Sequence, residues 1–89
     1  MIRRQIRVTG QVQGVGFRWF SKMNASRLGL TGWVRNCPDG SVELEVQGDE
    51  ASVEAMVEAV SRGPGYAWVD QVTTAPRPLA DEYSFHVTG

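Results

Sequence analysis

Residues 10–18 read Gly-Gln-Val-Gln-Gly-Val-Gly-Phe-Arg, and this stretch predicts that the fold begins with a strand, a glycine loop and a helix. A strand-like run over residues 2–12 leads into it, and a helical pattern follows. The closely spaced glycines Gly14 and Gly16 allow successive backbone N–H groups to turn toward one point. A helix start adds unpaired donors and a positive dipole end, and Arg18 adds a planar cation that fits phosphate or carboxylate. The stretch therefore predicts a site for a small anion, and phosphate fits best.

The size, composition and charge of the chain indicate a single globular domain and disfavour some classes of binding partner. It has 89 residues, which predicts one domain over residues 1–89, and 42% of them are hydrophobic, as in folded globular proteins. The net charge of −1 disfavours broad binding to nucleic acid or membrane surfaces, which usually needs a basic excess. The chain starts at Met1 and ends just past its last expected strand, so we expect it to be complete.

Cysteine and histidine are too few for several kinds of site. The single cysteine, Cys37, cannot form an internal disulfide, which favours a reducing, cytoplasmic location. The single histidine, His86, lies far from it in the chain, so neither a metal site nor a cofactor is expected. The charged N-terminus has no apolar run behind it, which predicts neither a signal peptide nor a membrane span. Nothing in the sequence requires more than a monomer.

The hydrophobic spacing predicts the order βαββαβ with one further short strand. Alternating apolar residues predict strands over residues 2–12, 30–36, 41–47, 66–74 and 83–87. Helical spacing predicts helices over residues 17–28 and 48–62. The Asp39-Gly40 step indicates a hairpin between the second and third strands. One sheet face is apolar and two amphipathic helices can cover it, so we expect an α+β, ferredoxin-like sandwich with a mainly antiparallel sheet.

Two motifs stand together at a specific spacing. Residues 12–18, Val-Gln-Gly-Val-Gly-Phe-Arg, lie on the loop after the first strand. Residues 32–43, Gly-Trp-Val-Arg-Asn-Cys-Pro-Asp-Gly-Ser-Val-Glu, span the second strand and the hairpin. This pair closely resembles the acylphosphatase family, in the form of its small stand-alone members. Residues 28–32 and the later pair 63–64 are also similar, so the resemblance covers essentially the whole chain.

The resemblance implies metal-independent hydrolysis of acyl phosphates, the mixed anhydrides of a carboxylic and a phosphoric acid. It implies that Arg18 binds the phosphoryl group and that Asn36 positions the attacking water. Backbone donors of the loop would complete the phosphate cradle, which comprises Gln13, Gly14, Val15, Gly16, Phe17 and Arg18. The expected partners are a small acyl phosphate substrate and phosphate or sulfate as product-like ligands.

Elementary chemistry agrees with the implied reaction. The leaving carboxylate has a conjugate acid with a pKa of about 4, so no general acid is needed. Phosphoryl transfer mainly requires positioning and charge stabilisation, which a guanidinium and a ring of N–H groups supply. Asn36 offers a carbonyl oxygen for a water and an amide for the substrate. We expect in-line attack on phosphorus, with the acceptor of the water's proton left open.

Several of these residues also suit other roles. Gly14 and Gly16 also suit a tight strand–helix turn, but Trp19 stands where a dinucleotide fingerprint needs a glycine, and no Gly-Lys-Ser/Thr follows as in a P-loop. Asn36 taken alone suits a turn residue. Cys37 has no histidine nearby in the sequence to activate it as a nucleophile.

Two other functions compete with hydrolysis. RNA-binding domains of this strand order stack bases on exposed aromatic residues of the first and third strands. Those positions here hold Arg, Gln and Thr, then Ser41, Glu43 and Glu45, so no nucleic-acid partner is expected. A catalytically silent accessory or anion-binding module of the same fold is the alternative. The presence of both Arg18 and Asn36 favours the enzyme.

Overall fold

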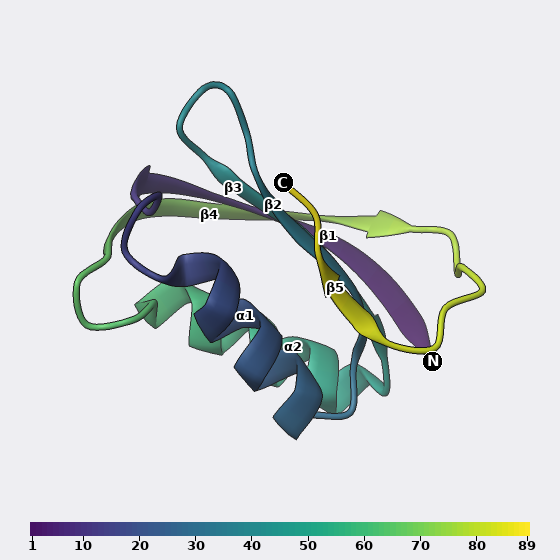
Figure 1. Cartoon of the computed structure of the whole chain (residues 1–89). Helices are drawn as coiled ribbons and strands as arrows, with labels where there is room; N and C mark the ends of the chain where they lie inside the picture. The colour runs from purple at the N-terminus through teal and green to yellow at the C-terminus, as the bar shows by residue number, and fades with distance from the viewer.

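A five-stranded sheet and two helices make up the computed structural model, which describes all of residues 1–89 (Figure 1). Along the chain the elements are β1 (Ile2–Gln11), α1 (Phe17–Arg27), β2 (Thr31–Asn36), β3 (Val42–Gly48), α2 (Glu50–Arg62), β4 (Trp68–Arg77) and β5 (Phe85–Val87). Both helices lie on the same face of the sheet, and no helix covers the other face (Figure 1). This arrangement confirms the expected ferredoxin-like α+β fold.

The strands lie in the order β4-β1-β3-β2-β5. β1 is antiparallel to β3 and β4, and β2 is antiparallel to β3. The short additional strand, β5, pairs with β2 in the parallel direction, so that Gly32 lies opposite Phe85 and Val34 opposite Val87. This pairing brings the C-terminal residues to the end of the sheet where β2 runs into its hairpin.

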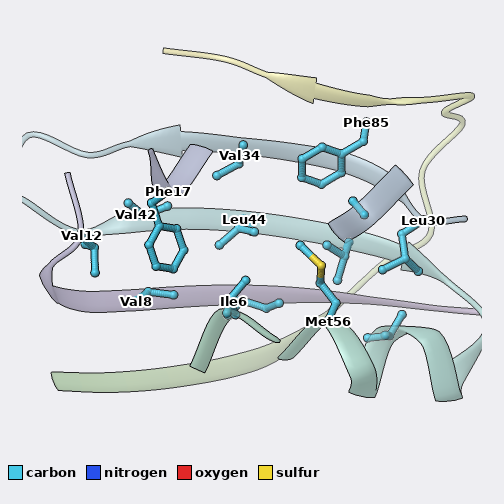
Figure 2. Close-up of a cluster of buried hydrophobic side chains, with 14 residues drawn as sticks. Ile6, Val8, Val12, Phe17, Leu30, Val34, Val42, Leu44, Met56 and Phe85 are labelled. Carbon is cyan, nitrogen blue, oxygen red and sulfur yellow. The ribbon is translucent and has the colours of Figure 1, made fainter. Parts of the chain in front are cut away.

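The core fills the space between the sheet and the helices (Figure 2). Alternate residues of the strands, such as Ile6, Val34 and Leu44, point toward the helices and are fully buried. Phe17 of α1 and Met56 of α2 pack against them. Burial of each such side chain contributes about 1.5–3 kcal/mol, so this layer holds both helices against the sheet.

Most charged residues on the strands form ion pairs. Arg4 faces the helices, where its guanidinium pairs with Glu54 of α2. Arg3 is buried on the side of the sheet without helices, where it donates to Glu45 at 2.7 Å and to Glu82 at 2.6 Å. The hydrogen bond with Glu82 raises the pKa of Arg3 above its ordinary value, although burial of the guanidinium opposes this.

The fourth strand differs from its expected limits of residues 66–74. Ala67 N–H donates to the carbonyl of Pro64 at 2.9 Å, and this turn keeps Tyr66 out of the sheet. The strand then continues through Pro76, because β4 lies at the sheet edge, where a residue without an N–H is tolerated. The last strand is confined to Phe85–Val87 instead of beginning at residue 83. No helix is both long and apolar enough to cross a membrane.

Candidate active site

The loop between β1 and α1 reverses the chain at the same end of the sheet as the β2–β3 hairpin (Figure 1). Gly14 and Gly16 adopt left-handed backbone conformations, with φ of +76° and +81°. Residues with a Cβ rarely adopt such angles, which explains the two glycines. Gly16 is the N-cap of α1, so the turn that it makes sets where the helix begins.

The amides of this loop are unpaired. From Gln13 to Trp19, no backbone N–H donates to an acceptor in the protein, and no side chain caps the helix. Unpaired N–H groups together with the positive end of the helix dipole favour a bound anion. The loop therefore forms a cradle of donors at the start of α1.

A pocket of about 460 Å³ lies at this cradle. The residues around it come from the loop, α1, β2 and β5, and are Val12, Gly14, Gly16, Phe17, Arg18, Trp19, Lys22, Asn36 and Val87. Its volume suits a small ligand larger than phosphate alone. Two of its residues are cations and none is an acid, so the pocket is electrostatically suited to an anion.

Arg18 stands on the first turn of α1 and is half-buried. Its Nη1 donates to the backbone oxygen of Gly89 at 2.7 Å, which holds the guanidinium toward the residues that follow β5. A guanidinium carries five N–H donors, so this bond leaves the others for a ligand. A cation at the positive end of a helix is unfavourable alone, and a bound anion would offset that repulsion.

Asn36 is the last residue of β2 and lies opposite Val42 of β3. It faces the helix side of the sheet, as Val34 does, because alternate residues of a strand share a face. Its side-chain amide, which is half-buried, makes no hydrogen bond within the protein. Both the carbonyl oxygen and the NH₂ group are thus free to bind a water and a ligand in the pocket.

Gln13 connects the loop to the hairpin. Its Nε2 donates to the carbonyl of Cys37 at 2.8 Å and to that of Ser41 at 2.9 Å. Hydrogen bonds from the Ser41 hydroxyl and N–H, and from Arg7, hold the pKa of Asp39 well below its usual value and stiffen the same hairpin. The cradle and Asn36 are therefore held together through Gln13.

Most of the expected site residues meet in the pocket. Gly14, Gly16, Phe17, Arg18 and Asn36 line it together. The structure contains no group of three or more His, Cys, Asp or Glu side chains arranged to bind a metal ion.

Two members of the expected cradle do not line the pocket. The side chain of Gln13 braces the hairpin, and Val15 packs against the core, so only their backbone N–H groups are available for an anion. Four residues that line the pocket were not predicted as site residues: Val12, Trp19, Lys22 and Val87. The sequence contained a signal for Lys22, because it follows Arg18 by four residues and therefore lies on the same face of the helix. Val87 reaches the pocket only because β5 pairs with β2.

Comparison with known proteins gives a consistent result over the whole chain. The acylphosphatase family model matches residues 4–87. The acylphosphatase of Bifidobacterium longum is 52% identical over 82 residues, which are 92% of this chain and 84% of that relative. The crystal structure of acylphosphatase from Bacillus subtilis superposes with a TM-score of 0.96 at 38% identity and covers 100% of both chains. A HypF in its phosphate- and nucleotide-bound form has a TM-score of 0.92 at 31% identity, over 99% of this chain and 12% of that one.

Proposed function

The chain belongs to the acylphosphatase family and hydrolyses acyl phosphates, and we propose that the Gln13–Arg18 loop and Asn36 form its catalytic site. One observation carries this assignment: Arg18 and Asn36 line the same pocket, and the loop amides beside them have no partner. The same observation disfavours a silent anion-binding module, since such a module needs the cradle but not a free amide beside it.

The phosphoryl group of the substrate binds in the cradle. The guanidinium of Arg18 and the free N–H groups at the start of α1 bind its oxygens and stabilise the charge that develops on them during transfer. Inorganic phosphate and sulfate are expected to bind in the same place as product-like ligands.

The carbonyl oxygen of Asn36 accepts a hydrogen bond from a water molecule and directs the water's lone pair at phosphorus. A new P–O bond forms, and the bond between phosphorus and the acyl oxygen breaks. The electron pair of that bond leaves with the carboxylate, which needs no proton because its conjugate acid has a pKa of about 4. The protons of the water remain on phosphate or pass to solvent, so this scheme requires no metal.

Hydrolysis in ¹⁸O-labelled water tests which atom is attacked. Benzoyl phosphate is hydrolysed by the enzyme, and both products are examined by mass spectrometry, with spontaneous hydrolysis measured in parallel. Attack on phosphorus places the label in inorganic phosphate. Label in benzoate would show attack on the carbonyl carbon and would refute the proposed role of Asn36.

We also propose that the protein acts as a monomer in the cytoplasm. The pocket is built from one chain, and the single thiol of Cys37 is buried and free, which suits a reducing compartment. Light scattering should give the mass of one chain, and fractionation of the source cells should recover the protein with cytoplasmic markers. A mass of two chains, or recovery with another fraction, would contradict the respective proposal.

A further inference from the structure

Lys22 is the only lysine of the chain, and it stands beside the anion cradle. It follows Arg18 by four residues on α1, so the two residues share a helix face about 6 Å apart along the axis. Every ion pair in the protein involves an arginine, and Lys22 makes no hydrogen bond to a side chain or carbonyl. An exposed cation is thus left unpaired at the wall of the pocket.

The surroundings of Lys22 extend away from the cradle. Lys22 also lines a second pocket of about 570 Å³, formed with residues such as Ser26 of α1 and His86 of β5. Neither pocket includes an aspartate or a glutamate. Trp19 and Val87 line the first pocket together with Lys22, and because they are 67% and 43% exposed they give it apolar walls. A short carbon chain can pack between these walls, and a negative group at its end would reach Lys22.

We propose that Lys22 selects acyl phosphates whose acyl chain carries a second anionic group, a carboxylate or a phosphate, two or three carbons from the reacting carbonyl. This inference rests on the proposed binding of the phosphoryl group by the Arg18 cradle. With that group in the cradle, the acyl chain extends along α1 past Trp19 and Val87. Arg18 and Lys22 line the same pocket from successive turns of α1, so one ligand can contact both side chains.

A different role for Lys22 makes a different kinetic prediction. If Lys22 bound the phosphoryl group itself, its loss would weaken hydrolysis of every acyl phosphate equally, because that group is common to all of them. If it binds a group on the acyl chain, its loss affects only substrates that carry the second charge. The ratio of kcat/KM for two substrates that differ only in this charge separates the two roles.

Succinyl phosphate and butyryl phosphate form such a pair, since a terminal carboxylate in one replaces a methyl group in the other. Both are assayed with wild type, Lys22→Met, Lys22→Glu and the control Arg27→Met. Arg27 is an exposed cation on the same helix that donates to Asn24 at 2.9 Å and lines neither pocket. Methionine keeps the length and helix propensity of both side chains.

In Lys22→Met the ratio of kcat/KM for succinyl phosphate to kcat/KM for butyryl phosphate should fall about three- to tenfold, as expected for loss of a partly solvated charge pair. Hydrolysis of butyryl phosphate should be retained. Lys22→Glu should lower the ratio further, and Arg27→Met should leave it unchanged. Added salt should reduce the succinyl preference of the wild type.

Three results would overturn the inference. They are an unchanged ratio in Lys22→Met, an equal loss for both substrates, and an equal fall in Arg27→Met. An active wild type with any of these results refutes the role of Lys22 alone. A folded wild type that hydrolyses neither substrate would refute the proposed function and this inference with it.

Discussion

The two hydrogen bonds from Gln13 to the β2–β3 hairpin allow a sharp test of how the site is held together. Gln13→Met removes the donor that reaches the carbonyls of Cys37 and Ser41, while it keeps the length of the side chain. Each carbonyl retains one other partner, because Gly40 N–H donates to Cys37 at 3.1 Å and Cys37 N–H donates to Ser41 at 2.8 Å. The change therefore removes two hydrogen bonds without leaving a buried acceptor wholly unpaired.

The expected magnitudes follow from this count. Two hydrogen bonds at about 0.5–1.5 kcal/mol each predict a loss of about 1–3 kcal/mol in the free energy of unfolding, and the lower part of this range is expected because both acceptors keep a partner. Activity should fall more than stability suggests, because a shift of about 1 Å between the cradle and Asn36 costs on the order of a hundredfold in rate. We expect kcat/KM for benzoyl phosphate to fall about 10- to 100-fold.

Urea unfolding followed by tryptophan fluorescence gives the first quantity, and phosphate release gives the second. Gln11→Met is the matched control, since Gln11 is an exposed glutamine at the end of β1 that lines no pocket. If the free energy of unfolding of Gln13→Met stays within about 0.5 kcal/mol of that control and the variant keeps its activity, the Gln13 hydrogen bonds do not position the site.

The other predictions concern the glycine turn, the buried arginine and pH. Gly16→Ala should cost about 1 kcal/mol of stability and most of the activity, because its φ of +81° is strained for alanine although no atom would clash; crystallography and calorimetry check this. Arg3→Met should lower the free energy of unfolding by about 2–3 kcal/mol and leave kcat unchanged, because far from the pocket Glu82 loses its partner and Glu45 keeps only its longer pair with Arg77; unchanged stability would refute it. The pKa of Asp39 is lower in the folded state, so its stabilisation is present above about pH 4 and is lost as pH falls further; the stability advantage of wild type over Asp39→Asn should shrink in acid and would contradict this if it grew.

Local signals in the sequence were sufficient for much of the fold and for the centre of the site. The alternation of apolar and polar residues in β1 and β3, with the apolar stripe of α2, predicts a sheet that packs one face against helices. The glycines at positions 14 and 16 before Arg18 predict a loop that binds an anion. The position of Asn36 followed from the hairpin signal and from the resemblance, and the structure places it in the pocket with Arg18.

Features that depend on distant residues were not predicted. The side chain of Gln13 reaches carbonyls of the hairpin, a contact that no local pattern encodes. Val87 joins the pocket because β5 pairs with β2, and β4 extends through Pro76 because it lies at the sheet edge. In each case long-range pairing, rather than local propensity, decides the outcome.

The central claim is that Arg18 and Asn36 act together in one metal-independent site, and phosphate release from benzoyl phosphate in EDTA tests it most directly. Wild type, Arg18→Ala and Asn36→Ala are compared after thermal unfolding has shown that each is folded. We predict turnover by the wild type in EDTA and a loss of at least about a hundredfold in kcat/KM in each variant, as for removal of a group that stabilises or positions the transition state. A folded variant within about tenfold of the wild type, or a wild type that requires added metal, would contradict the account.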